Sequence, residues 1–224
     1  MLQRIPLDQR VLPDYTWGEE KMNMITHIVG GAIGVVVLVF AVLIAAFHGN
    51  GWGVVSGAVY GASLILLYSV SATYHGLPQC TGKKVMQVID HCTIYVLIAG
   101  TYTPIVLTAM RPLYPTLAWV IFGIQWGAAL IAATFTAIDL KRYSKLSMAC
   151  YIIMGWMIVL TLKPTIAAVS WNGFWWLLAG GVAYTVGAVL YGKGKKKRYF
   201  HSVFHIFGDL GSILQAVCIL FYVL

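Results

Sequence analysis

Long apolar stretches are the feature of this chain that most limits how it can fold. Seven stretches approach or exceed the roughly 20 apolar residues that a helix needs to cross a bilayer. They cover residues 24–46, 52–75, 85–110, 113–138, 146–162, 174–191 and 200–224. Only 10% of the 224 residues are charged, whereas soluble domains carry about 25%. Because lipid offers the backbone no hydrogen-bond partners, we predict an all-α fold, a polytopic seven-transmembrane helix bundle.

The chain is predicted to be a single domain, residues 1–224, because the apolar stretches leave no soluble segment of domain size. Residues 1–23 are polar and carry both charge signs, which predicts a short N-terminal segment outside the membrane. This segment lacks the basic, apolar and cleavable regions of a signal peptide, so we expect no cleavage. The fifth stretch is the shortest, and its continuation past Pro164 would make it a kinked helix.

The basic residues predict the orientation. Thirteen of the 15 lie in segments that alternate topology places on the same side of the membrane. They are Arg4, Arg10, Lys21, Lys83, Lys84, Lys141, Arg142, Lys145, Lys193, Lys195, Lys196, Lys197 and Arg198. Only Arg111 and Lys163 fall on the other side. The positive-inside rule therefore predicts a cytoplasmic N-terminus and an outer C-terminus.

The net charge of +8 follows from these same short loops. We therefore expect contact with anionic lipid headgroups and no binding of nucleic acid. The four cysteines, Cys80, Cys92, Cys150 and Cys218, are scattered and predict neither a disulfide framework nor a zinc ribbon. Short termini without targeting signals favour a bacterial inner membrane protein.

Histidines gather at one predicted membrane depth. Five of the six fall near the cytoplasmic ends of predicted helices, and His48 is the exception. The five are His27, His75, His91, His201 and His205. His201 and His205 are four residues apart and share one helix face, as do Ser71 and His75. Because imidazole is costly in hydrocarbon and binds metals readily, this clustering predicts a metal site.

The spacing suggests roles within such a site. His75, His201 and His205 would supply three nitrogens from two helices, and three protein ligands with a water molecule is the usual catalytic zinc arrangement. Asp90 could orient that water and accept its proton, and Ser71 could support a ligand or a substrate carbonyl. Imidazole also suits iron, copper and nickel. A lone histidine near the interface can equally be a hydrogen-bonded anchor, an alternative that applies to His27 and His91.

Four motifs occur in order along the chain: residues 20–27 (EKMNMITH), 71–75 (SATYH), 90–95 (DHCTIY) continuing into 99–104 (AGTYTP), and 201–205 (HSVFH). As a set they resemble the hemolysin III branch of the progestin and adiponectin receptor family, which is related to the alkaline ceramidases. The resemblance covers essentially the whole chain.

The resemblance implies a seven-helix bundle with a cytoplasmic N-terminus and a zinc site near the cytoplasmic face. Its three histidine ligands match His75, His201 and His205, its aspartate beside the metal-bound water matches Asp90, and its serine matches Ser71. Glu20, Asn23 and His27 match a further motif, which we interpret as outer contacts of the ligands or a lid over the site, and His91 is a further outer candidate.

Asp209 departs from the expected pattern, because it follows His205 by one helical turn where an apolar residue is expected. An ionisable group within a span is a functional candidate, and it could accept a hydrogen bond from a ligating histidine. A buried protonated acid in helix packing is the equal alternative.

Three functions fit these features. The leading hypothesis is a zinc-dependent hydrolase of a lipid amide or ester that acts in membrane lipid homeostasis, with Thr101, Tyr102 and Gln125 as candidate cavity lining. The second is a non-catalytic lipid sensor or receptor with structural zinc. A channel or cytolysin is less favoured, because intramembrane charge is concentrated at one end. A retinal protein is excluded, since residues 200–224 contain no lysine, and the predicted orientation is opposite to that of G-protein-coupled receptors.

Overall fold

The computed structural model describes residues 6–7, 9–194 and 197–224, which form helices and their connections without any β-strand. Arg4, Lys195 and Lys196 of the basic segments lie outside the described residues. The predicted all-α class is confirmed. The elements are α1 (Trp17–Phe47), α2 (Gly51–Gly76), α3 (Thr81–Pro104), the π-helix η1 (Ile105–Met110), α4 (Pro115–Ile138), α5 (Ser144–Gly155), the 3₁₀-helix η2 (Met157–Thr161), α6 (Leu162–Gly194) and α7 (Phe200–Tyr222).

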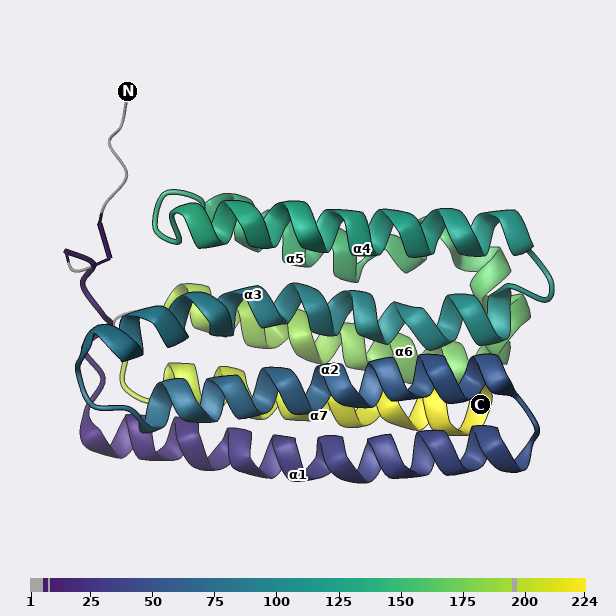
Figure 1. Ribbon diagram of the computed structural model, residues 1–224, viewed down its shortest axis with the longest axis horizontal. Helices are drawn as coiled ribbons and strands as arrows, with labels where there is room; N and C mark the ends of the chain where they lie inside the picture. Colours follow the sequence, from purple (N-terminus) through teal and green to yellow (C-terminus); the bar gives the residue numbers. More distant parts are fainter. Residues whose placement is uncertain (1–5, 8, 195–196) are drawn as a thin grey trace.

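The long helices lie side by side along one axis (Figure 1). Helix α1 packs against α2 and α7, α6 packs against α7, and α3 lies between α2 and α4. Helices α4 and α5 form one side of the bundle, farthest from α1. The start of α1, the end of α2 and the start of α7 meet at one end of the bundle, and this meeting point positions the candidate site.

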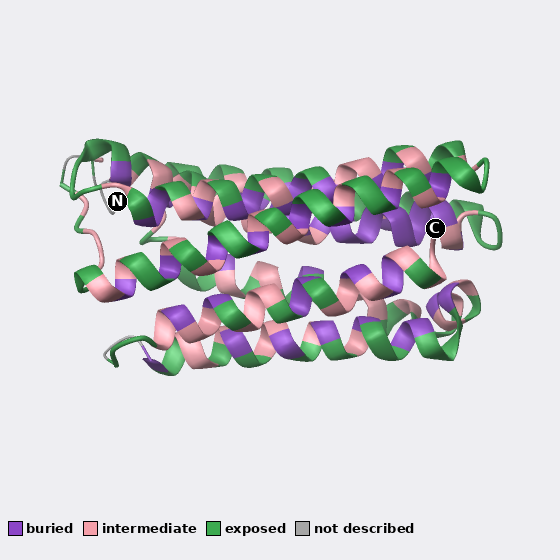
Figure 2. Cartoon of the chain, turned by 90° about the horizontal axis from the view of Figure 1, so that it is seen from below, coloured by how far each residue is buried: buried purple, intermediate pink, exposed green. Residues whose placement is uncertain are grey.

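Among the residues that the structure describes, six helical segments are long and apolar enough to cross a membrane. Large apolar side chains cover their outer faces, as at Val36, Phe40 and Ile131, each about half exposed or more. Buried residues line the inner faces instead (Figure 2). This arrangement is typical of helices whose outer surface contacts lipid, because apolar surface that is exposed in the isolated chain is then covered by hydrocarbon.

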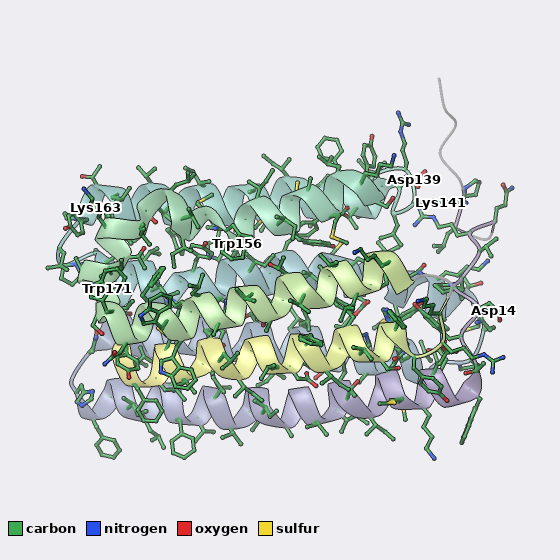
Figure 3. The ribbon with its side chains drawn as sticks, turned by 180° about the vertical axis from the view of Figure 1, so that it is seen from behind. Asp14, Asp139, Lys141, Trp156, Lys163 and Trp171 are labelled. Atoms are coloured by element: carbon green, nitrogen blue, oxygen red, sulfur yellow. The ribbon has the colours of Figure 1, made fainter. Side chains whose placement is uncertain are left out.

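The predicted fifth and sixth spans both fall within one of these segments, Ser144–Gly194. Its backbone leaves the helical region at Ser170, with φ 63° and ψ 170°, where the Ser170 hydroxyl accepts a hydrogen bond from the Gly173 N–H at 3.5 Å as an N-cap. Lys163 and Trp171, on either side of this break, lie at one end of the bundle, and Lys141 lies at the other (Figure 3). Pro164 sits in the first turn of α6, where a missing N–H is tolerated.

The connections alternate between the two ends of the bundle. The start of α1 and the α2–α3, α4–α5 and α6–α7 connections share one end, and the α1–α2 connection and the C-terminus share the other. The described residues of the predicted basic segments therefore lie together at the first end. We call this end the basic end.

Helix α1 begins at Trp17, ahead of the apolar stretch that starts at Met24. Thr16 and Glu19 form a capping box, in which the Glu19 N–H donates to the Thr16 hydroxyl at 3.3 Å and the Thr16 N–H donates to Glu19 Oε2 at 2.9 Å. Local hydrogen bonding, not hydropathy, thus decides where α1 starts. The extra turns place Glu20 and Asn23 on the same helix face as His27.

Candidate metal centre

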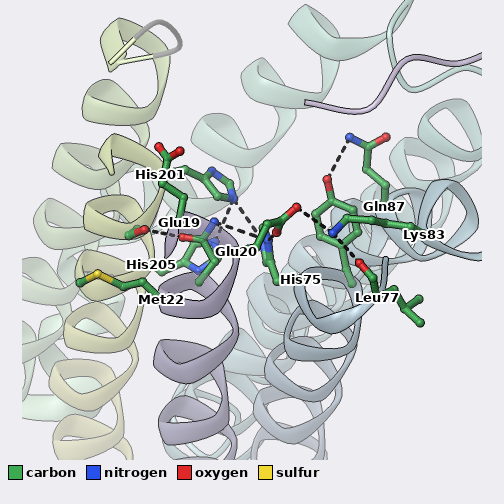
Figure 4. Close-up of polar contacts among 12 residues, drawn as sticks. Glu19, Glu20, Met22, His75, Leu77, Lys83, Gln87, His201 and His205 are labelled. Atoms are coloured by element: carbon green, nitrogen blue, oxygen red, sulfur yellow. Dashed lines mark hydrogen bonds and ion pairs between the residues drawn. The ribbon is translucent and has the colours of Figure 1, made fainter. Parts of the chain in front are cut away.

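Three histidines from two helices converge at the basic end of the bundle (Figure 4). His75 lies in the last turn of α2, and His201 and His205 lie in the first two turns of α7. His201 Nε2 is 3.3 Å from His75 Nε2 and 3.0 Å from His205 Nε2. One nitrogen of each ring lies within 4.8 Å of the other two, so this group could hold a metal ion.

The start of α7 is tied directly to α1. Tyr199 precedes α7 in the left-handed conformation, with φ 62°, and its N–H donates to Glu19 Oε1 at 2.7 Å. Glu19 uses its other oxygen in the Thr16 capping box. One carboxylate therefore links the first turn of α1 to the beginning of α7, which fixes where His201 enters the site.

Glu20 determines the tautomer of His75. Glu20 Oε2 is 2.6 Å from His75 Nδ1, and Glu20 Oε1 forms an ion pair with Lys83 Nζ at 2.7 Å. Lys83 is 2% exposed and also donates to the Leu77 carbonyl at 2.8 Å. A carboxylate can only accept, so Nδ1 of His75 carries the proton and Nε2 presents a lone pair. This contact outweighs the Asn23 amide nitrogen, 3.5 Å from the same Nδ1.

Thr26 determines the tautomer of His205 in a similar way. The Thr26 hydroxyl donates its single hydrogen to the backbone carbonyls of Met22, at 3.1 Å, and Asn23, at 2.9 Å. Its oxygen can therefore only accept from His205 Nδ1, which lies 3.4 Å away. Nε2 of His205 thus presents a second lone pair toward His201.

Two lone pairs facing a third imidazole nitrogen suit a cation. A tetrahedral zinc ion with Zn–N bonds of about 2.0–2.1 Å would hold its nitrogens about 3.3 Å apart. The separations of 3.3 Å and 3.0 Å are close to this value. His201 Nδ1 is buried without a described hydrogen-bond partner, so this ring is free to place its proton there and turn Nε2 to a metal. The donor set therefore fits zinc.

Asn23 holds α1 against α7 beside the ligands. It is fully buried, and its side-chain oxygen accepts a hydrogen bond of 2.6 Å from the Ser202 hydroxyl. Ser202 lies directly after His201, so this bond restrains the turn of α7 that carries the ligands. Two residues of the motif 20–27, Glu20 and Asn23, therefore lie within hydrogen-bonding distance of His75.

Two aromatic rings cover the histidine cluster. His27 stacks on His205 with ring centroids 3.7 Å apart and meets Tyr68 edge-on at 5.1 Å, and it stands outside the group of three. Tyr15 stacks on His201 at 5.0 Å. Burial raises the pKa of the Tyr15 phenol above its ordinary value, so Tyr15 is a neutral ring over the cluster.

Asp90 and Ser71 lie beside the cluster on α3 and α2. The Asp90 carboxyl group is close to Ser71 and His75. The Ser71 hydroxyl is buried without a hydrogen bond of good geometry to any described residue, so it is available to a ligand. His91 stands outside the group of three histidines, and its Nδ1 lies 2.8 Å from the Gln87 carbonyl and 3.5 Å from Asp90.

Asp209 lies deeper in the bundle, near Gly30 of α1 and Tyr68 of α2. Its Oδ1 has no hydrogen-bond partner among the described residues, and no described bond joins it to a ligating histidine. One turn further on, Ser212 Oγ lies 2.6 Å from the hydroxyls of both Tyr68 and Tyr184. Asp209 therefore belongs to a polar region between helices below the histidines.

The three candidate cavity residues use their polar groups in hydrogen bonds to backbone carbonyls, within α3 for Thr101 and between separate elements for Tyr102 and Gln125. The Thr101 hydroxyl donates to the Leu97 carbonyl, the Tyr102 hydroxyl donates to the Gly155 carbonyl, and the Gln125 amide donates to the Met154 carbonyl. Thr101 and Tyr102 also line a small cavity of about 40 Å³ between α3 and α6.

Sequence reasoning missed four residues around the site: Tyr15, Thr26, Lys83 and Ser202. Lys83 was interpreted only as a determinant of orientation. Thr26 and Ser202 lie within the motifs of residues 20–27 and 201–205, yet a hydroxyl beside a histidine is too common to indicate a role. Tyr15 and Lys83 reach the site through contacts between segments distant in sequence.

The long apolar helices define a multi-pass membrane protein with a histidine cluster at one end. The sequence model of the family described as Haemolysin-III related matches residues 15–216. The chain therefore belongs to the Haemolysin-III related family.

Individual relatives agree. The chain is 39% identical over 208 residues to "Hemolysin-3 homolog" of Bacillus subtilis (strain 168), which covers 93% of this chain and 96% of the relative. It is 38% identical over 206 residues to "Hemolysin-3" of Bacillus cereus, covering 92% of each. It is also 24% identical over 218 residues to "Monocyte to macrophage differentiation factor" of Homo sapiens, covering 92% of this chain and 84% of the relative. The last match supports the predicted link to the progestin and adiponectin receptor family.

Proposed function

We propose that this protein is a zinc-dependent hydrolase that cleaves an amide or ester bond of a membrane lipid, and that it serves membrane lipid homeostasis. The observation that carries the proposal is the convergence of His75 Nε2 and His205 Nε2 on His201 Nε2, at 3.3 Å and 3.0 Å. Two of these nitrogens are held as lone-pair donors by Glu20 and Thr26. The ligands lie at one end of a bundle whose outer faces are apolar, and a membrane lipid is therefore the substrate that we propose.

We further propose seven membrane spans, a cytoplasmic N-terminus, an outer C-terminus and residence in a bacterial inner membrane. The break at Ser170 supports counting Ser144–Gly194 as two spans. The excess of lysine and arginine in the segments at the basic end supports a cytoplasmic location for that end. The two Bacillus relatives support a bacterial membrane.

The chemistry follows from the residues around the cluster. A zinc ion held by His75, His201 and His205 would lower the pKa of a water molecule and polarise a carbonyl oxygen. Asp90 takes the proton that the attacking water loses and returns it to the leaving nitrogen or oxygen, while a new C–O bond replaces the cleaved C–N or C–O bond. The Ser71 hydroxyl, which lies close to the Asp90 carboxyl group, would donate a hydrogen bond to the substrate.

Metal content tests the site itself. Detergent-purified protein should contain about one zinc ion per chain by elemental mass spectrometry, because three imidazoles converge. His75→Ala, His201→Ala and His205→Ala should each lose most of it. His48 lies at the opposite end of the bundle, so His48→Ala should retain zinc and serves as the control. Absence of metal from protein purified without chelators would rule out the zinc site.

A non-catalytic lipid sensor with structural zinc is the second candidate, favoured by the packing of Tyr15 and His27 over the ligands. Asp90→Asn separates the two functions. Catalysis predicts that hydrolysis of lipid amides or esters falls by 100-fold or more, as for loss of a general base, while zinc content is unchanged. A sensor predicts no hydrolysis in either protein. The measurement is mass-spectrometric product release from mixed lipid vesicles.

The names of the two Bacillus relatives, Hemolysin-3 homolog and Hemolysin-3, suggest lysis as a third candidate. A pore needs a continuous polar path, whereas the cluster of described histidines is confined to the basic end. Dye release from liposomes by the purified protein would favour lysis over hydrolysis.

A further inference from the structure

A cleft of about 480 Å³ opens beside the metal centre at the basic end, between the start of α1 and the α2–α3 connection. Its inner wall is the chain of contacts formed by Lys83, Glu20 and His75, which three different helices supply (Figure 4). Its volume lies within the range typical of small-molecule sites. Of the three ligands, only His75 lines the cleft, together with Glu20 on its Nδ1, whereas its Nε2 faces His201. The cleft is therefore distinct from the metal position.

The walls of the cleft combine apolar surface with charge. Met24, Leu77 and Pro78 supply apolar surface, and Trp17, which is 78% exposed, stands at the mouth. Tryptophan at the end of a membrane helix is typical of the interface between hydrocarbon and headgroups. The ligand that fits such walls is amphipathic, with an apolar part against the side chains and a polar part at the mouth.

The charge balance of the cleft favours an anion. Both oxygens of Glu20 are occupied, by His75 and Lys83, and Glu19 is occupied by Tyr199 and the α1 cap. Lys21 lines the cleft, and its ammonium contacts the Trp17 ring at 4.9 Å. No carboxylate in the described part of the chain forms an ion pair with Lys21. The cleft therefore presents one uncompensated positive charge.

The geometry points to a lipid-binding site: the cleft holds the phosphate-bearing, anionic headgroup of a membrane lipid, and Lys21 is its recognition cation. The apolar walls, the exposed Trp17 and the location at the basic end select a lipid over a free anion. This inference rests on the proposed orientation, which sets the basic end in the cytoplasmic leaflet, and it requires neither zinc nor hydrolysis. The basic loops predict contact with anionic headgroups but indicate no particular site, and the proposal assigns this contact to one cleft.

Native mass spectrometry of the detergent-solubilised full chain tests the site. Phosphatidylglycerol and phosphatidylcholine with identical chains are titrated separately. The wild-type protein should bind phosphatidylglycerol more tightly, and Lys21→Gln should weaken that binding about fivefold, the factor expected for one basic residue at an anionic surface. Lys21→Arg should bind phosphatidylglycerol as tightly as the wild-type protein. Lys141→Gln removes an exposed charge from another connection at the same end and should leave the affinity for phosphatidylglycerol unchanged.

Three results would overturn the proposal. Unchanged phosphatidylglycerol binding in Lys21→Gln would show that Lys21 does not recognise the headgroup. Equal weakening by Lys141→Gln would mean that loop charge in general attracts the lipid. Displacement of the lipid by millimolar inorganic phosphate would assign the cleft to a soluble anion. Zinc is measured in the same samples. A protein that prefers the anionic headgroup but contains no zinc would refute only the proposed hydrolase. A protein that contains zinc but shows no headgroup preference would refute only the lipid site.

Discussion

The three clustered histidines differ in what the nitrogen that faces away from the cluster contacts. His75 faces the Glu20 carboxylate, His205 faces the Thr26 hydroxyl, and His201 Nδ1 has no described partner. A carboxylate that accepts the far N–H makes an imidazole a stronger metal ligand and holds its ring in place. We therefore expect His75 to be the strongest of the three ligands.

Glu20→Gln tests this ranking. The substitution keeps the shape of the side chain but removes the charge that strengthens His75, so zinc affinity should fall about 10- to 100-fold. The measurement is competition with a chromophoric zinc chelator. Asp14→Asn removes the same charge from an exposed position near the same end and should have little effect. Equal affinities in the wild type and Glu20→Gln would contradict the role assigned to Glu20.

At the level of the helices, α1 assembles the site because it packs against both α2 and α7. Its close approach depends on Gly30. A Cβ atom at this position would lie 2.6 Å from both Asp209 Oδ1 and a ring carbon of Tyr68. At the neighbouring Gly31, a Cβ atom would lie 3.8 Å from Tyr68 Cβ, an ordinary contact.

Gly30→Ala should therefore destabilise the fold, and Gly31→Ala is its matched control. The added methyl group at Gly30 forces α1 away from Tyr68, and overpacking of this kind costs about 1–3 kcal/mol. At Gly31 the same change should be neutral or mildly stabilising, because alanine favours helix over glycine. Thermal unfolding in detergent, followed by circular dichroism, measures both. Similar melting temperatures for the two variants would mean that α1 can shift at no cost.

For the whole molecule, the decisive property is that successive connections lie at opposite ends of the bundle. Cys80, in the α2–α3 connection at the basic end, is exposed, and Cys218 is buried. Leu113 is 54% exposed in the α3–α4 connection at the opposite end. These positions allow the two ends to be assigned to the two sides of the membrane.

A membrane-impermeant maleimide applied to intact cells should leave Cys80 unmodified until the cells are permeabilised, because the basic end is predicted to face the cytoplasm. Leu113→Cys in a Cys80→Ser background should react without permeabilisation. Gel-shift detection of the modified thiol measures both. The reverse pattern would invert the proposed topology.

The sequence by itself determined that the chain is helical, which stretches are long and apolar enough to span a membrane, and which family it belongs to. Apolar stretches in lipid must satisfy their backbone groups internally, so hydropathy leaves only helices open to this chain. Alternating loop charge placed the five histidines near one end, and the spacing of four put His201 and His205 on one face. The starting residue of α1 depended on the Thr16 and Glu19 cap, which hydropathy does not report.

Only the tertiary structure decided how the helices turn toward one another. Helices that are apolar on nearly all sides carry little information about which face points inward, so rotation and depth depend on close packing, as at Gly30. That packing brings His75 Nε2 within 3.3 Å of His201 Nε2 and joins Lys83 to Glu20. These contacts link residues far apart in the chain, and no local pattern encodes them.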